Sequence, residues 1–200
     1  EYLQNTYSNL VDAYKKNELD KDTGIGIYSL SAVIVDRAEP SEALKANLAW
    51  SLGLESPNHL ITSAQVEAFR KGESISEEVD VRAERGAYFL STSLSLEPNS
   101  SKTWRIVSDV NKSVTDVEFL KNLIKSEANL NQLIDEDITE GSENLRHLVA
   151  AADGLQLTQD GLRNIRHFTN TMFNIMRGGI FDNNYNIEKS DFSSYLKKAN

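Results

Sequence analysis

The spacing of hydrophobic residues changes near Asn111. Before this position, apolar side chains mostly recur at every second residue, as in β-strands, and after it they recur every three or four residues, as on one face of an α-helix. Strands followed by helices predict an α+β fold. We expect residues 1–111 to be mainly antiparallel β-structure, part of a β-sandwich, with an N-terminal helix over about residues 2–15. We expect residues 112–200 to form a helical linker or the start of a helical domain.

Two strands are expected in the first half of the β-region. Apolar residues alternate with smaller or polar ones over residues 28–34, and more regularly over residues 44–52. This period of two is typical of a half-buried antiparallel strand. Residues 22–24 end the N-terminal helical pattern before the first of these strands. Residues 38–41 are expected to form the turn between the two strands.

A β-hairpin is expected over residues 90–107. Its first strand is predicted by alternation over residues 90–96, and its second covers residues 104–107. Pro98 and Asn99 stand between them at the second and third positions of a four-residue turn, where both residue types are favoured. We therefore expect the two strands to pair with each other.

Helix boundaries are predicted from capping residues and glycines. A short helix is expected to start at Thr62 or Ser63 and to stop at Gly72, and the longest helix is expected to start at Thr158 and to end before Gly178. In the second part of the chain, the apolar spacing predicts helices over about residues 114–124, 130–134, 145–152, 158–177 and 188–199.

The composition narrows the classes of partner. The net charge is −9 and the isoelectric point is near 4.9, which argues against nucleic acid or an anionic membrane as the main partner. Cysteine is absent, so disulfides and thiol chemistry are excluded. No apolar run approaches the length of a membrane span. The chain starts at Glu1 without a leader, and we expect a cytoplasmic piece of a longer protein.

The strongest candidate for a binding site lies in the longest predicted helix. Arg163, Arg166, His167 and Asn170 follow the spacing i, i+3, i+4 and i+7, so one helical face presents all four. The guanidinium group of arginine can donate two parallel hydrogen bonds to phosphate or diol oxygens. Arg166, His167 and Asn170 are therefore candidate substrate-binding residues. The alternative is a solvated face, or a polar seam against a neighbouring domain.

Other patterns do not support catalysis or metal binding. The run that starts at Asp182 begins like a calcium loop, but Ile187 stands where the loop needs glycine and Ser193 where it needs glutamate. The carboxylates near Asp135 and Glu140 lack an apolar wall that would raise a pKa for acid catalysis. We predict no catalytic residue, no metal and no cofactor in this chain.

Two tryptophans and two histidines remain to be placed. Trp50 and Trp104 lie on strands with alternating apolar residues, so we expect both in the core. The alternative is that one of them forms a stacking platform in a sugar-binding sandwich. His59 and His147 have no second ligand at metal spacing, and we expect both at the surface.

Four segments resemble the inverting disaccharide phosphorylases similar to cellobiose phosphorylase. They are Asp36–Glu42, Arg85–Phe89, Leu94–Trp104 and Arg166–Phe181. The resemblance implies a large bacterial protein with an N-terminal β-sandwich, a helical linker and a helical barrel. In that family a single aspartic acid protonates the glycosidic oxygen while inorganic phosphate, the co-substrate, attacks from the opposite face. The chain contains no counterpart of that aspartate motif.

The resemblance therefore implies a non-catalytic segment of a carbohydrate-active enzyme. The parent protein would cleave β-linked disaccharides or oligosaccharides with phosphate, and this segment would brace the adjacent helical barrel. Its partners would then be the oligosaccharide or phosphate of the parent enzyme and the barrel itself, without nucleic acid or membrane. The alternative is an independent α+β protein-interaction or structural domain with no enzymatic activity.

Overall fold

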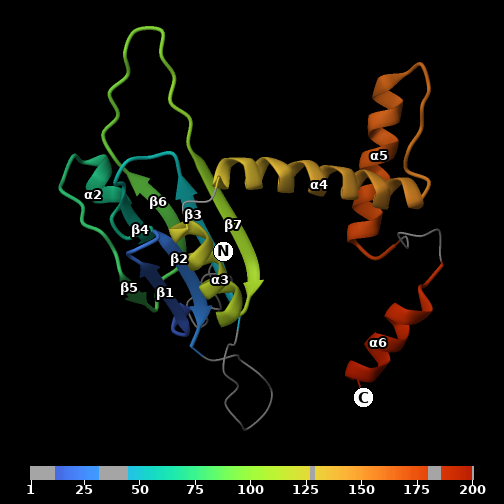
Figure 1. Cartoon of the computed structure of the whole chain (residues 1–200), viewed down its shortest axis with the longest axis horizontal. Helices are drawn as coiled ribbons and strands as arrows, with labels where there is room; N and C mark the ends of the chain where they lie inside the picture. The colour runs from blue at the N-terminus through green and yellow to red at the C-terminus, as the bar shows by residue number, and fades with distance from the viewer. Residues whose placement is uncertain (1–11, 32–44, 127–128, 180–185, 200) are drawn as a thin grey trace, which may run out of the picture. The chain divides into compact units, whose positions relative to one another are not determined.

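A computed structural model describes residues 12–31, 45–126, 129–179 and 186–199. The chain divides into two compact units, Glu1–Ala128 and Asn129–Asn200. Among the described residues, the first unit contains the strands and the helices α2 and α3, and the second contains helices (Figure 1). The α+β class expected from the sequence is confirmed. The helix expected over residues 2–15 lies mostly outside the described residues, but its end is wrong, because Lys15 already begins a strand.

The first unit is built on a five-stranded antiparallel sheet with strand order β5-β1-β2-β3-β7. These strands are β1 (Lys15–Asp20), β2 (Ile25–Leu30), β3 (Ala46–Leu52), β5 (Asp80–Arg82) and β7 (Arg105–Lys112). A second sheet pairs β4 (Asn58–Thr62) with β6 (Gly86–Ser91). The first unit also contains the helices α2 (Val66–Arg70) and α3 (Val114–Lys125).

A strand is present near each of the two expected positions, and the two strands pair with each other. The first lies earlier than expected, because β2 covers Ile25–Leu30, and residues 32–34 of the expected strand lie outside the described residues. The turn before β2 forms because the amide of Gly24 donates to the carbonyl of Asp20 at 2.8 Å, and Gly24 adopts a φ of 72° that favours glycine. The turn expected at residues 38–41 lies outside the described residues. Both faces of β3 are buried, since Leu48 and Trp50 point to one face and Ala49 to the other.

The expected hairpin over residues 90–107 is only half correct. The turn is present, because the Ser100 amide donates to the Glu97 carbonyl at 3.0 Å and Asn99 has a φ of 60°. The strand expected over residues 90–96 is wrong beyond Ser91, where β6 ends, and the flanking strands β6 and β7 do not pair with each other. Strand β6 pairs with β4, and β7 pairs with β3. Alternation along a strand reports which face is buried but not which strand lies beside it.

The cap expected for the short helix is also wrong. Helix α2 begins after Gln65, without a side-chain cap, and ends before Gly72 as predicted. Thr62 is instead the last residue of β4, and its hydroxyl donates to the buried carboxylate of Glu78 at 3.0 Å. The same carboxylate oxygen accepts the amides of Ile61 and Thr62 at 2.8 Å each. Glu78 thereby satisfies backbone donors at the end of β4.

The second unit contains α4 (Leu130–Ala151), α5 (Gly161–Met176) and α6 (Lys189–Ala199). Two short helices were expected where α4 is continuous for 22 residues, so α4 and not α5 is the longest described helix. Helix α4 contains Gly141, which weakens a helix without breaking it. Helix α5 is capped by Asp160, whose carboxylate accepts the amides of Leu162 and Arg163, and not by Thr158. The end of α5 before Gly178 is confirmed.

Candidate functional site

A row of polar side chains crosses three neighbouring strands of the large sheet. In the strand register, Asn17 of β1 stands opposite Tyr28 of β2, and Tyr28 stands opposite Asn47 of β3. Residues paired in this way point to the same face of a sheet. Asn17 is buried, Tyr28 is half-buried and Asn47 is exposed, so the row runs from the interior towards solvent.

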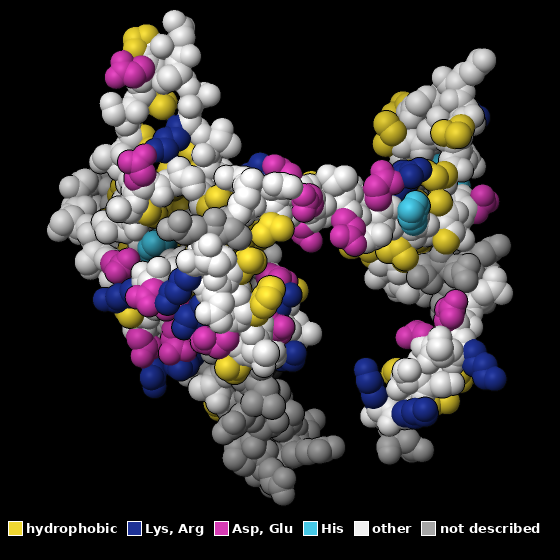
Figure 2. All heavy atoms as spheres, in the orientation of Figure 1, with side chains coloured by type: hydrophobic (Ala, Val, Ile, Leu, Met, Phe, Trp, Pro, Cys, Tyr) yellow, Lys and Arg dark blue, Asp and Glu magenta, His cyan; other side chains and the backbone are white. Residues whose placement is uncertain are grey.

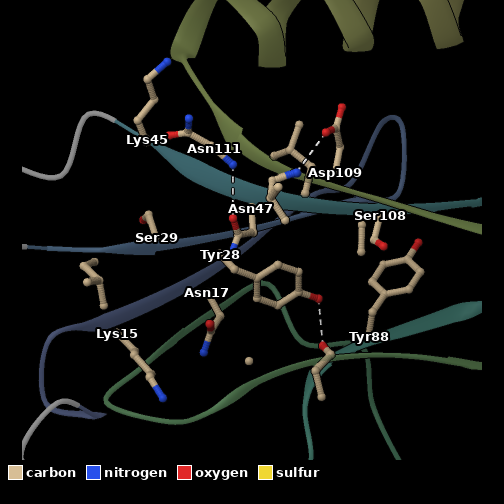
Figure 3. A pocket seen from close by; sticks show the side chains of 16 residues that line it. Lys15, Asn17, Tyr28, Ser29, Lys45, Asn47, Tyr88, Ser108, Asp109 and Asn111 are labelled. Carbon is tan, nitrogen blue, oxygen red and sulfur yellow. Dashed lines mark hydrogen bonds between the residues drawn. The ribbon is translucent and has the colours of Figure 1, made fainter. Parts of the chain in front are cut away.

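An irregularity between β3 and β7 extends this row to a fourth strand. Ala46 pairs with Lys112 and Leu48 with Asp109, so β7 has one extra residue opposite Asn47. Asn111 lies in this bulge with a φ of 59°. Its amide donates to the side-chain oxygen of Asn47 at 3.2 Å (Figure 3). Bulges of this kind redirect side chains at the edges of sheets.

Three hydrogen bonds tie the large sheet to β6 and the segment that precedes it. The Tyr28 hydroxyl donates to the carbonyl of Ala87 at 2.7 Å, and the Asn17 amide donates to the carbonyl of Glu84 at 3.0 Å. In the other direction, the Tyr88 hydroxyl donates to the carbonyl of Gly24 at 2.7 Å. Because both tyrosines are held through their hydroxyls, their rings have fixed positions between the two sheets.

The ring of Tyr28 fits between two glycines. A Cβ atom at Gly26 would lie 2.7 Å from the Tyr28 hydroxyl oxygen, and one at Gly86 would collide with the edge of the ring. The same atom at Gly86 would lie 2.9 Å from the side-chain oxygen of Asn17. Neither glycine has a positive φ in the structure, so the close approach of Tyr28, and not backbone conformation, is what requires glycine here.

These side chains line an open groove of about 770 Å³. In Figure 3, Tyr28 lies among the labelled side chains from β1, β3, β6 and β7. The polar lining residues are Lys15, Asn17, Tyr28, Ser29, Lys45, Asn47, Tyr88, Ser108, Asp109 and Asn111. The volume falls in the range of about 300–1,000 Å³ that is usual for small-molecule sites.

The charges of the groove are largely paired within the protein. Lys15 forms an ion pair with Asp12 at 2.6 Å, and Asp109 forms one with Lys112 at 2.6 Å. Lys45 has no ion pair among the described residues. Burial raises the pKa of the Tyr28 phenol, with smaller contributions from Tyr88 and Glu78, and burial also raises the pKa of Tyr88. Both phenols therefore stay neutral hydrogen-bonding groups near neutral pH.

The groove offers hydrogen-bonding groups to a ligand. It contains one carboxylate, and that carboxylate is ion-paired and exposed, so it lacks the apolar surroundings of a general acid. Its amides and hydroxyls are suited to sugar hydroxyls, which both donate and accept hydrogen bonds. Across the described parts of the chain, no group of three or more side chains is arranged to hold a metal ion.

The residues predicted as substrate-binding lie on α5 in the second unit. Arg163, Arg166 and Asn170 are exposed, whereas His167 is half-buried and its Nε2 lies 2.8 Å from the carbonyl of Asp153, just after α4. His167 thus connects α5 to the end of α4. The Asn170 side-chain oxygen lies 3.5 Å from the amide of Asn174. The binding role of Arg166, His167 and Asn170 stays a prediction.

Apolar side chains are exposed on the same helices. Figure 2 shows hydrophobic side chains at the surface of the second unit. Ile165 is 65% exposed, Met176 is 77% exposed and Tyr195 of α6 is 66% exposed.

Val149 and Thr171 are the buried residues of the described helices in this unit. A Cβ atom at Gly154 would collide with Val149 and would lie 2.9 Å from Thr171.

The expectations for tryptophan and histidine were partly wrong. Trp50 is buried as predicted, but Trp104 is 45% exposed. Trp104 directly precedes the edge strand β7, on which Ile106 is also exposed. His59 is not a surface residue, because its side chain is only 13% exposed beside Glu77 and its ring packs near Tyr88. His147 is exposed, as predicted.

The remaining candidates from the sequence are consistent with solvated surface. The carboxylates of Asp135, Glu136 and Glu140 lie along the exposed side of α4, where Glu136 accepts a hydrogen bond from Gln132 at 2.7 Å. Residues 182–185 of the calcium-like run lie outside the described residues, whereas Ile187 is exposed and Ser193 lies within α6. No described helix has the length and apolar character to cross a lipid bilayer.

Comparison with known proteins gives one partial match. Residues 181–200 match the family model described as glycoside hydrolase family 149 insertion domain 1. The match covers one tenth of the 200 residues and includes α6. A comparison with curated proteins finds no matching sequence. The family match points to a segment of a carbohydrate-active enzyme, the class suggested by the sequence resemblance.

Sequence reasoning did not identify the groove. Asn17, Tyr28 and Asn47 come from three separate strands, and only the strand register brings them together. A partial signal was present: Asn47 occupies a polar position in the alternation of β3, on the same face as the buried Ala49. Gly26 and Gly86 make room for the Tyr28 ring, and the sequence alone does not show that this ring lies beside them.

Proposed function

We propose that this chain is a non-catalytic segment of an enzyme that cleaves β-linked disaccharides or oligosaccharides with inorganic phosphate. The match of residues 181–200 to a glycoside hydrolase family 149 insertion domain carries the proposal. The resemblance of other segments to cellobiose phosphorylase supplies the reaction, in which phosphate replaces water as the attacking group. The groove of the first unit offers hydrogen-bonding side chains to a ligand.

Within this proposal, the second unit packs against the adjacent helical domain of the parent enzyme. Exposed apolar side chains on α5 and α6, such as Ile165 and Tyr195, support such packing. Arg166, His167 and Asn170 then face either the substrate or the seam between the domains. Replacing Arg166 with alanine in the full-length protein separates these roles. A higher KM for sugar or phosphate indicates substrate contact, a lower melting temperature indicates the seam, and no change in either contradicts both.

The reaction is tested by assaying the full-length protein with cellobiose and with longer β-linked glucans, with and without inorganic phosphate. The expected result is a sugar 1-phosphate that forms only when phosphate is present, while the 200-residue chain alone forms none. Release of reducing sugar without phosphate would indicate hydrolysis and contradict the proposal. A reading frame that stops shortly after Asn200 would favour the alternative, an independent interaction domain.

A further inference from the structure

We propose that the groove over β1, β2, β3 and β7 binds a neutral oligosaccharide. The inference rests on the proposed function for the class of ligand, and it goes beyond it by placing the sugar on residues of this chain. The site lies in the first unit, and none of the residues that line it belongs to the segments that suggested a carbohydrate-active enzyme, except the β6 residues from Gly86 to Tyr88.

The groove offers hydrogen-bonding groups that the protein itself does not use. Asn47 accepts one bond through its oxygen, but its side-chain NH2 group has no partner among the described residues. The same holds for the hydroxyl of Ser108 and the side-chain amide of Asn111. Ser108 pairs with Ala49, two residues from Asn47 on the same strand face. A ligand in the groove therefore meets donors and acceptors together, as a sugar hydroxyl requires.

An apolar surface accompanies these polar groups. The Tyr28 ring lines the groove at the centre of the polar row, and Ala49, Ala87 and Val110 add small apolar side chains. Sugars present C–H groups on the faces of their rings, and aromatic rings provide a flat surface for such groups. The hydrogen bond from Tyr28 to Ala87 fixes the ring in advance, so binding costs little side-chain entropy.

Charge favours a neutral ligand over an anion. Lys15 and Asp109 are neutralised by partners at 2.6 Å, which leaves Lys45 as the unpaired charge among the described lining residues. The described lining contains no arginine, the residue best suited to bind phosphate through two parallel hydrogen bonds. A single exposed lysine gives weak anion binding in water, whereas amides and hydroxyls bind neutral hydroxyl groups irrespective of charge.

The test is isothermal titration calorimetry of the 200-residue chain with cellohexaose and with maltohexaose, and separately with inorganic phosphate. Two variants address the groove. Asn47→Ala removes an exposed donor, and Ser108→Trp fills the groove from an exposed position on β7. Trp104→Ala is the matched control, because Trp104 is an exposed aromatic residue of the same unit that does not line the groove. Far-UV circular dichroism confirms that each variant is folded.

The expected result is binding of an oligosaccharide that Asn47→Ala weakens about fivefold, the effect of losing one hydrogen bond, and that Ser108→Trp abolishes. Trp104→Ala leaves the affinity unchanged. Binding that survives both groove variants, binding lost in Trp104→Ala, or binding of phosphate alone would overturn the proposal. Absence of any oligosaccharide binding would also overturn it while leaving phosphorolysis by the parent enzyme open. Tighter binding of cellohexaose than of maltohexaose would support the β-linked substrates of the proposed function, and the opposite order would contradict them. Either order supports sugar binding in the groove.

Discussion

The hydroxyl of Tyr28 donates a hydrogen bond of 2.7 Å to the backbone carbonyl of Ala87 and so joins the two sheets of the first unit. Tyr28 lies in the centre of the large sheet, and Ala87 lies in β6. The contact fixes the aromatic ring at the middle of the polar row and also sets where β6 crosses that face. The stability of the first unit and the shape of the groove therefore depend on the same side chain.

Replacing Tyr28 with phenylalanine is expected to lower the free energy of unfolding by about 1 kcal/mol, since the carbonyl of Ala87 loses its partner in a half-buried position. Urea unfolding followed by tryptophan fluorescence measures this change, because both tryptophans of the chain lie in the first unit. Tyr195→Phe on the exposed side of α6 is the control and should have no effect. An equal stability of Tyr28→Phe and wild type would contradict the role of this bond.

The same residue predicts a loss of stability at alkaline pH. Burial raises the pKa of Tyr28 above its ordinary value, so the folded protein holds this proton more tightly than the unfolded chain. The stabilisation is fully present below about pH 10, the ordinary pKa of tyrosine, and is lost as the pH rises through the raised value. Stability measured between pH 8 and 11 should fall less steeply in Tyr28→Phe than in wild type, and parallel curves would refute the coupling.

Two glycine-to-alanine substitutions should have opposite effects. Gly86→Ala places a Cβ against the Tyr28 ring and is expected to destabilise the first unit by roughly 1–3 kcal/mol, as overpacking does. Gly141→Ala lies within α4 with no atom within 4 Å of the new Cβ and should stabilise that helix by about 1 kcal/mol. Fluorescence reports the first change, and circular dichroism at 222 nm reports the second. A neutral Gly86→Ala would show that Tyr28 is not tightly held.

Glu78 is expected to be essential for the end of β4. Its carboxylate accepts the amides of Ile61 and Thr62, and glutamine cannot accept all the donors that surround it. Glu78→Gln should therefore cost about 1–3 kcal/mol of stability in chemical denaturation. Glu73→Gln, an exposed position in the same segment, serves as the control. If the two variants were equally stable, the carboxylate would not hold this strand end.

The start of α3 should be sensitive to acid. Ser113 and Asp116 form a capping box, and the hydrogen bond from the Ser113 hydroxyl is the main reason that the pKa of Asp116 lies below its ordinary value. The contribution of Asp116 is present above about pH 4 and is lost as the pH falls through the lowered pKa. Ser113→Ala should cost about 1 kcal/mol at pH 7 and less below pH 4. A constant difference between wild type and variant at all pH values would exclude this linkage.

Local features of the fold were predictable from the sequence, and pairings were not. The alternation around Trp50 predicted β3, and Gly72 and Gly178 marked helix ends, because these depend on neighbours in the chain. The partners of β6 and β7 were wrong, since pairing depends on residues far away in sequence. The local pattern predicts a helix cap at Thr62 or Ser63. It does not reveal the contact of Thr62 with Glu78, because that contact joins residues 16 positions apart.

The candidate site illustrates the same division. Arg166, His167 and Asn170 were found because a single helix brings them onto one face. The row of Asn17, Tyr28 and Asn47 depends on two strand registers and could be recognised only in three dimensions.

The most direct test of the account is an NMR titration of the isotopically labelled chain with cellohexaose, which shows where the sugar binds. The account predicts shifts of the side-chain amides of Asn47 and Asn111 and of backbone amides in β2, β3 and β7. Shifts confined to α5, around Arg166 and Asn170, would place the sugar on the second unit and contradict the groove. An unchanged spectrum at millimolar cellohexaose would contradict a sugar-binding role for this chain.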